Sequence, residues 1–251
     1  MSDTLHIGFV VEGPTDYCML EETVATLLEG RDFVPHRLQP EMSEAFQAIP
    51  GEHGGGWPGV CRWCLQTAQQ GGGQIRNSYP YDSNHLLIVQ VDADVGEKSY
   101  ADAQVRDPYP SEATLRCVDP CPPPSATTDR LRTLVLRWLG EESAPPRIVL
   151  CTPSKALETW ILVALFPECN VVTRQDHIEC RRHPEKTLRS RRGDRRLVSG
   201  NHKNVAKYRE LAPEFGRNWA RVPAACTEAE RLAHEFGAAL IALGTLDSHR
   251  P

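Results

Sequence analysis

Short apolar runs alternate along the first two thirds of the chain with segments whose apolar residues recur at helical spacing. This alternation predicts an α/β fold with a mostly parallel central sheet flanked by helices. The run at 86–91 is apolar throughout, which is typical of a central strand that is buried on both faces. The predicted strands cover residues 5–11, 33–38, 86–91 and 147–151, and the predicted helices cover 17–28, 60–70, 127–139 and 154–165.

The pattern weakens after residue 166. Residues 204–211 and 227–243 are predicted to be helical, and the second segment has a clear apolar stripe. Between them and the α/β region lies a strongly basic segment, 181–196, with eight Lys or Arg residues against two acids. Residues 95–125 are polar and proline-rich, which predicts a long loop inserted between two regular elements.

Length and composition set broad limits. The chain has 251 residues, enough for one large domain with a sizeable core. A net charge of -5 does not exclude nucleic-acid binding, because a global balance hides local patches. No long uncharged apolar run is present, and the N-terminus lacks the basic start of a secretory signal, so we expect a cytoplasmic protein without a membrane span.

The nine cysteines are expected to be reduced in that compartment. The pairs Cys61/Cys64 and Cys117/Cys121 have spacings compatible with a structural Zn²⁺ site. Their flanking residues lack the pattern of a known zinc finger or ribbon. We therefore favour unlinked thiols and keep zinc as the alternative.

Acidic residues follow two of the predicted strands. Glu12 and Asp16 come after the first strand, and Asp92 and Asp94 come directly after the run 86–91. Open α/β sheets bind ligands at the carboxyl ends of their strands, and four carboxylates gathered there would suit Mg²⁺ or Mn²⁺. Helix capping is an equal alternative for Asp16 alone. It does not account for Asp-x-Asp after a core strand.

These motifs resemble a known family. A first strand ending in Glu-Gly-x-x-Asp (Glu12 to Asp16) and a later strand ending in Asp-x-Asp (Asp92 to Asp94) are similar to the TOPRIM domain of topoisomerases, primases and OLD-family nucleases. The first motif looks most like the nuclease branch, which includes small proteins of bacterial anti-phage defence systems. The resemblance spans about residues 5–165, and the motifs that carry it are short.

The resemblance implies metal-dependent cleavage of phosphodiester bonds with Mg²⁺ or Mn²⁺, and the chemistry of such cleavage favours two ions. Glu12, Asp16, Asp92 and Asp94 match the metal-binding acids of the family, and Glu12 is also a candidate catalytic residue. Two such ions would activate the attacking water and stabilise the leaving oxygen.

Further residues match this branch more loosely. Ser154 and Glu158 fit the Ser and the acid that follow the next strand in related nucleases, where they would add metal ligands. Ser154 has an alternative role as the N-cap of the helix at 154–165. Lys203 resembles the distal lysine of these nucleases, and Lys155 is a second candidate for stabilising the transition state. A solvated surface lysine is the alternative for Lys203.

The basic segment is a candidate nucleic-acid interface, because its charges would hold phosphates without reading sequence. It has no interleaved aromatic residues, so base stacking is not expected there. A solvated loop is the alternative. The candidate binding residues are Arg181, Arg182, Lys186, Arg189, Arg191, Arg192, Arg195 and Arg196.

The leading hypothesis is therefore a metal-dependent endonuclease acting on DNA or RNA, as an effector or component of a phage-defence system. Its TOPRIM-like catalytic domain would cover residues 1–170, with the loop insertion at about 95–125, and residues 171–251 would form a basic segment and a helical C-terminal extension packed on it. The chain has no Gly-x-x-x-x-Gly-Lys-Ser/Thr loop, so any ATPase would be a separate partner. The sequence leaves the oligomeric state open.

Two alternatives remain from the residues themselves. One is a non-catalytic module that binds nucleic acid or a partner protein and holds a structural Mg²⁺. The other is nucleotidyl transfer, as in primases. It is weakened because no zinc-binding front domain or helicase-binding tail is recognisable.

Overall fold

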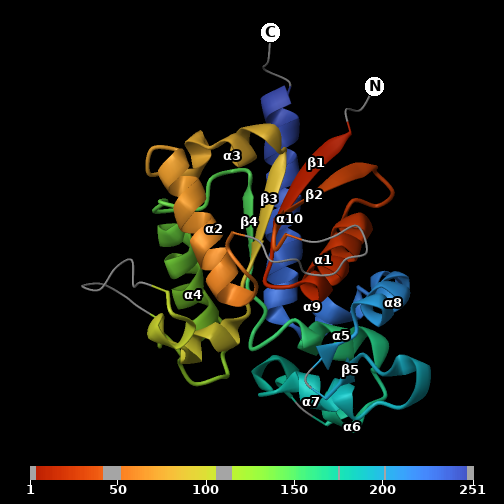
Figure 1. Ribbon diagram of the computed structural model, residues 1–251. Helices are drawn as coiled ribbons and strands as arrows, with labels where there is room; N and C mark the ends of the chain where they lie inside the picture. The colour runs from red at the N-terminus through yellow and green to blue at the C-terminus, as the bar shows by residue number, and fades with distance from the viewer. Residues whose placement is uncertain (1–3, 42–51, 106–114, 175, 201, 248–251) are drawn as a thin grey trace.

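The computed structural model describes residues 4–41, 52–105, 115–174, 176–200 and 202–247 (Figure 1). It shows an α/β fold built on a four-stranded sheet in the order β2-β1-β3-β4. All three strand pairs are parallel, as predicted. The strands are β1 (Leu5–Val10), β2 (Phe33–Gln39), β3 (Leu86–Gln90) and β4 (Ile148–Cys151).

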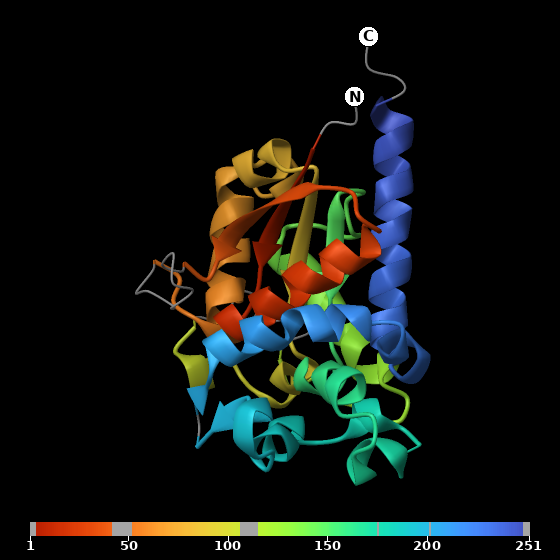
Figure 2. The ribbon, with the colours of Figure 1, turned by 90° about the vertical axis from the view of Figure 1, so that its right-hand side faces the viewer.

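Helices cover both faces of the sheet, and successive side chains of each strand point to opposite faces. In β1, Ile7 and Phe9 join the apolar cluster on one face, whereas Val10 joins the cluster on the other. Helices α1 (Pro14–Leu27) and α10 (Thr227–Asp247) pack on the first face. The second face is covered by α2 (Gly56–Gln70) and α4 (Ser125–Trp138), as Figures 1 and 2 show.

The carboxyl ends of the strands face a second group of elements, which occupies the lower part of Figures 1 and 2. Helix α8 lies along α1 and connects this group to the layer that covers the sheet. The group and its connecting helices comprise α5 (Glu158–Leu165), α6 (Asn170–Thr173), α7 (Pro184–Arg189), the antiparallel pair β5 (Val198–Ser199) and β6 (His202–Lys203), α8 (Val205–Arg217) and α9 (Arg221–Ala225).

The predicted helix at 154–165 begins later than expected. Its first residue is Glu158, and Ser154 does not cap it, so that prediction is wrong. Lys155 has a left-handed backbone with φ of 65°, which interrupts the helix path after β4. The capping alternative for Asp16 stays open: Asp16 lies in the first turn of α1, and its carboxylate accepts from the backbone N–H groups of Gly13, the N-cap residue, and of Asp16 itself.

The remaining elements are short. The short elements comprise α3 (Tyr79–Ser83) and the 3₁₀ turns at Ile75–Asn77, Ala93–Glu97, Ala101–Ala103, Ile178–Cys180 and Gly193–Arg195. The centre of the predicted loop insertion, 106–114, lies outside the described residues. Within the described part of the chain, no helix is both long and apolar enough to cross a membrane.

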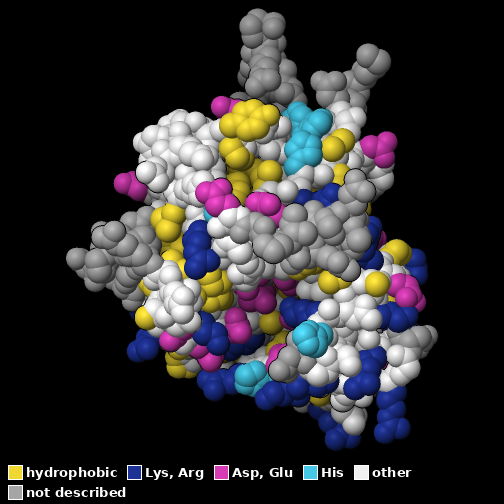
Figure 3. Space-filling view, viewed as in Figure 1, with side chains coloured by type: hydrophobic (Ala, Val, Ile, Leu, Met, Phe, Trp, Pro, Cys, Tyr) yellow, Lys and Arg dark blue, Asp and Glu magenta, His cyan; other side chains and the backbone are white. Residues whose placement is uncertain are grey.

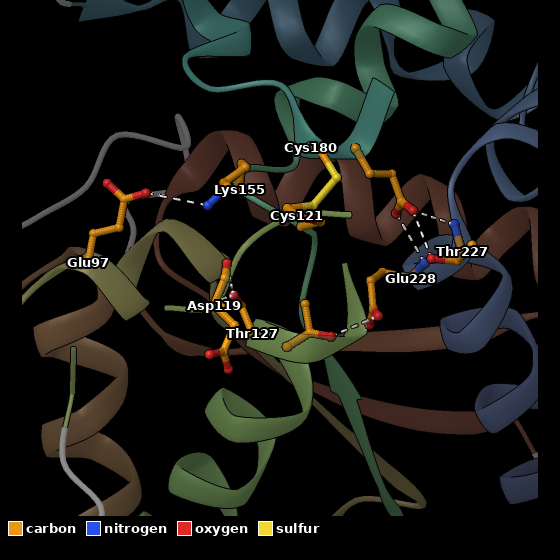
Figure 4. The surroundings of a disulfide bond; sticks show 11 residues. Glu97, Asp119, Cys121, Thr127, Lys155, Cys180, Thr227 and Glu228 are labelled. Atoms are coloured by element: carbon orange, nitrogen blue, oxygen red, sulfur yellow. Dashed lines mark hydrogen bonds and ion pairs between the residues drawn. A yellow bond between two sulfur atoms is a disulfide. The ribbon is translucent and has the colours of Figure 1, made fainter. Parts of the chain in front are cut away.

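A disulfide joins Cys121 to Cys180, although these residues are 59 positions apart in the sequence. It links the segment before α4 to the chain before α7, close to Lys155 (Figure 4). The expectation of reduced thiols is therefore wrong for these two cysteines. It also removes Cys121 from the zinc alternative, and Cys61, Cys64 and Cys117 are buried free cysteines.

The segment next to Cys180 is also anchored to α10. The Glu179 carboxylate accepts hydrogen bonds from the backbone N–H groups of Thr227 and Glu228, at 2.6 and 3.1 Å. Glu228 in turn accepts a hydrogen bond from the Thr128 hydroxyl on α4, at 2.8 Å. The disulfide and these bonds together fix the elements beyond the sheet edge against α4 and α10.

Replacing both disulfide cysteines by serine is expected to lower the free energy of unfolding by about 4 kcal/mol. The chain-entropy relation gives this value for a closed loop of this length, because the cross-link limits the unfolded chain. Urea denaturation of the wild type and of Cys121→Ser/Cys180→Ser measures the difference. Reductant should lower the Tm of the wild type and leave that of the double variant unchanged; an equal response of both proteins would contradict the cross-link.

Candidate functional site

The loops after β3 and β4 are joined by backbone hydrogen bonds that continue the pairing of the two strands. The N–H groups of Ala93 and Asp94 donate to the carbonyls of Pro153 and Lys155, at 2.9 and 3.1 Å. The left-handed turn at Lys155 brings its carbonyl into this position. These bonds fix the Asp-x-Asp motif against the loop that leads into α5.

Asp92 is held at the centre of this arrangement. Its Oδ1 accepts hydrogen bonds from the backbone N–H of Leu157 and from the Gln90 side-chain amide, at 3.2 and 2.9 Å. The backbone N–H of Asp92 donates to Oε1 of Glu12, at 2.8 Å. The Gln90 amide oxygen also accepts from the Glu12 backbone N–H, at 3.0 Å. One glutamine therefore bridges the two acidic motifs.

Asp16 and Glu158 meet at Lys203. The Lys203 ammonium lies 2.6 Å from Oε1 of Glu158 and 3.9 Å from Oδ1 of Asp16. The Tyr208 hydroxyl donates to the same Glu158 oxygen, at 3.4 Å. Asp16, Asp92 and Glu158 are between 2 and 9% exposed, whereas the Lys203 side chain is 37% exposed. The lysine thus reaches a buried group of acids from the edge.

Asp94, Ser154 and Lys155 lie at the margin of this acidic cluster, which we define as Glu12, Asp16, Asp92 and Glu158. Asp94 is exposed and, with Lys155 and Arg182, lines a hollow of about 150 Å³. The Lys155 ammonium pairs with Glu97 at 3.4 Å, so it points away from the buried acids. Ser154 is buried, and its hydroxyl lies 4.0 Å from Sγ of Cys121.

Burial first, and mutual repulsion second, disfavours the charged forms of these acids. Burial, followed by repulsion from Asp16, raises the pKa of Glu12 to about 8. Burial raises the pKa of Asp16 to about 6, although the Lys203 ammonium acts in the opposite direction. Burial and then the Glu12 carboxylate raise the pKa of Asp92 well above its ordinary value.

The pKa of Lys203 responds in the complementary way. Burial lowers it, but the Asp16 and Glu158 carboxylates outweigh that effect and raise the pKa of Lys203 well above its ordinary value. The lysine therefore stays charged and neutralises part of the acidic cluster.

The donor set of this cluster fits a hard divalent cation, since it consists of carboxylate oxygens brought together under mutual repulsion. The cluster is not preformed as a cage: among the described residues, no three His, Cys, Asp or Glu side chains stand in a metal-binding arrangement. Glu12 is engaged by the Asp92 amide, and Glu158 is engaged by Lys203. Cation binding would require these side chains to turn toward a common centre.

The predicted nucleic-acid residues divide among three hollows. Arg182 lines the hollow beside Asp94, and Arg181 and Lys186 line a larger one. Arg195 pairs with Glu214 at 2.7 Å. Figure 3 shows Lys and Arg side chains over the lower part of the face seen in Figure 1, below recessed acidic side chains. Arg192 and Arg195 line the third hollow, and Arg191 lines both this one and the larger one. Arg189 is half-buried and Arg196 is exposed.

The sequence reasoning missed Gln90 and Tyr208. Gln90 is the polar last residue of an otherwise apolar strand, and that position was a usable signal. Tyr208 belongs to the apolar stripe of α8 and gave no sign that its hydroxyl would reach Glu158.

Comparisons with known proteins found no match to a protein-family model, to a curated protein or to a solved structure. The α/β fold and the acidic cluster at the sheet edge therefore define the class of site by geometry alone.

The Tm of the metal-free protein is expected to fall as the pH rises from about 5 to about 8. The folded state keeps protons on Glu12 and Asp16 that the unfolded chain releases near pH 4.5 and 3.8. Their stabilising contribution is complete below those values and is lost as the pH rises through about 6 for Asp16 and about 8 for Glu12. Differential scanning fluorimetry in EDTA measures this dependence.

Mg²⁺ should raise the Tm more at the alkaline end of this range, because carboxylate ligands must be deprotonated. Glu12→Gln is the matched control: its side chain stays neutral, so the fall in Tm should be smaller. Equal pH dependence of the wild type and Glu12→Gln would contradict the assignment of the raised pKa to Glu12.

Proposed function

We propose that the protein is a divalent-metal-dependent nuclease that cleaves phosphodiester bonds in DNA or RNA, as an effector or component of a bacterial anti-phage defence system. The observation that carries the proposal is the acidic cluster, in which side chains from α1, α5 and the loops after β1 and β3 meet beside one lysine. The resemblance to the nuclease branch of TOPRIM proteins supports the reaction type and the biological role.

The acidic oxygens would hold Mg²⁺ or Mn²⁺, with Glu12, Asp16 and Asp92 as the principal ligands and Glu158 and Asp94 beside them. A bound divalent ion supplies an activated water and neutralises charge on a phosphate oxygen. With two ions, the cluster would have to open further, because its present hydrogen bonds occupy Glu12 and Asp92. Ser154 is the least supported ligand, since its hydroxyl is turned toward Cys121.

Lys203 is the best-placed positive charge for the developing negative charge of the transition state. It already lies against Asp16 and Glu158 and is partly exposed. Lys155 has a different role in this proposal: its side chain is only 8% exposed, pairs with Glu97 and lines the hollow beside Asp94, where it would contact a substrate phosphate held in that hollow.

The proposal places the protein in the cytoplasm, with a separate ATPase as a partner. The Cys121–Cys180 disulfide is unusual for that compartment, where thiols are generally kept reduced.

One observation favours a second candidate function. The Lys203 ammonium stands between Asp16 and Glu158, where it already neutralises the acids. A non-catalytic module would retain this arrangement and bind nucleic acid or a partner protein, with at most one structural Mg²⁺. Mg²⁺ binding without cleavage of any DNA or RNA substrate would favour this module over the nuclease.

Asp92→Asn is expected to reduce Mg²⁺-dependent cleavage of plasmid, single-stranded DNA and RNA by about 100-fold or more. Losing a ligand should cost at least as much as losing a partner that only orients a ligand. Asn keeps the shape and the ability to accept the Leu157 hydrogen bond, so the fold should persist. Cleavage is measured with Mg²⁺, with Mn²⁺ and with EDTA.

Asp82→Asn makes the same chemical change on a side chain that is 69% exposed and outside the cluster, so its activity should match that of the wild type. Metal-dependent cleavage that survives Asp92→Asn would remove the acidic cluster as the active site.

Lys203→Gln is expected to lower the single-turnover cleavage rate by about 100-fold with little change in substrate affinity, because its charge would act on the transition state. Lys207→Gln, on the first turn of α8, is the matched control. A lysine that only stabilises the fold would lower the Tm and leave the rate of the folded fraction unchanged.

A further inference from the structure

A hollow of about 580 Å³ opens beyond the end of α5, between that end and α7. Three cations line it: Arg181, Lys186 and Arg191. The hydroxyl residues Thr187 and Ser190 lie between them, and one acid, Glu168, lies at its rim. Positive charges therefore outnumber negative ones among the lining residues.

These three cations lack acidic partners within the described part of the chain. No described carboxylate forms an ion pair with Arg181, Lys186 or Arg191. The Arg181 guanidinium donates to the Thr187 hydroxyl at 3.3 Å, and that of Arg191 donates to Sγ of Cys169. Neutral oxygen and sulfur are weak counterparts for a guanidinium.

The two arginines are also partly removed from water. Nε of Arg181 and Nε of Arg191 are buried donors without a hydrogen-bond partner among the described residues. The Arg191 guanidinium lies over the Phe166 ring, 5.1 Å from its centroid, which fixes its plane. Burying charges without an anion is unfavourable, so an anionic ligand would stabilise this arrangement.

We propose that this hollow is a phosphate-binding pocket in which Arg181, Lys186 and Arg191 hold one phosphate group. The planar forks of Arg181 and Arg191 suit bidentate contact with phosphate oxygens, and Lys186 adds a mobile point charge. The proposed binding of phosphate rests on these contacts alone and does not require the protein to be a nuclease.

The position of Arg182 indicates a nucleic-acid strand as the source of the phosphate. Arg181 and Arg182 are consecutive, yet they line different hollows: Arg181 this one, and Arg182 the one beside Asp94 and Lys155. A strand held at the acidic cluster would therefore pass Arg182 and reach Arg181. The choice of a nucleic-acid strand as the ligand rests on the proposed function. A free nucleotide is the other source of the same phosphate group.

The test is binding without cleavage, with the full-length protein in EDTA. The probes are a short fluorescent single-stranded oligonucleotide and adenosine monophosphate, with adenosine as the uncharged control. Lys186→Gln should weaken oligonucleotide binding and reduce the slope of log affinity against log salt by up to about 0.7, because the pocket neutralises one phosphate of a single strand. The double variant Arg181→Gln/Lys186→Gln should weaken binding further without a second step in the slope, because both residues hold the same phosphate.

Lys207→Gln removes an equivalent lysine charge outside the pocket and should leave the slope unchanged. Lys186→Arg should retain binding, and Lys186 is exposed, so its variants should keep the wild-type Tm. Weaker oligonucleotide binding without measurable adenosine monophosphate binding assigns the pocket to a strand phosphate. Loss of adenosine monophosphate binding in Lys186→Gln assigns it to a free nucleotide.

If the Lys186→Gln variant binds both probes with the same affinity as the Lys207→Gln variant, the proposed phosphate-binding pocket is rejected. The result is separable from the proposed function. Intact cleavage with unaltered binding rejects only the pocket, whereas pocket-dependent binding without any cleavage rejects only the nuclease.

Discussion

The burial of several carboxylates in one place, together with their mutual repulsion, is the constraint around which the carboxyl edge of the sheet is built. Glu12, Asp16 and Asp92 are brought together from separate parts of the chain, and each has a raised pKa. Such a group is costly unless protons, a lysine or a metal ion compensate its charge. In this structure Lys203 supplies part of that compensation, and protons would supply the rest at acidic pH.

The fold holds this unfavourable group in place through contacts made elsewhere. The apolar strands and the helices on both faces fix where β1 and β3 end. The hydrogen bonds from the loop after β4 to the loop after β3 then fix Asp92. The stability of the core thus maintains an electrostatically unfavourable arrangement at the carboxyl edge of the sheet.

Much of this could be predicted from local sequence. The four strands are short apolar runs with clear ends, and the acids that follow two of them mark the carboxyl edge of the sheet. The local sequence pattern did not predict the features that depend on contacts between distant parts of the chain. Ser154 resembles an N-cap, but the left-handed turn at Lys155 delays the helix. Cys121 has a nearby partner in sequence at Cys117, yet the fold places it against Cys180.

Other features were unpredictable for related reasons. Helices α6 and α7 are too short to show a periodic pattern, and the two-residue strands β5 and β6 have no apolar alternation. The position of Lys203 beside Asp16 depends on that small hairpin, so the resemblance to a family, and not the spacing of residues, made Lys203 a candidate. The basic segment was visible as composition, but its division among separate hollows depends on how α7 packs against α5.

The most direct test of the account is a crystal of the protein grown at mildly alkaline pH, soaked in Mn²⁺ and measured at the manganese absorption edge. The account predicts an anomalous peak within coordination distance of the Glu12 and Asp92 carboxylates, with the Glu12 side chain turned away from the Asp92 amide. Absence of a peak in the acidic cluster, with the Glu12–Asp92 hydrogen bond and the Lys203–Glu158 pair both intact, would contradict it.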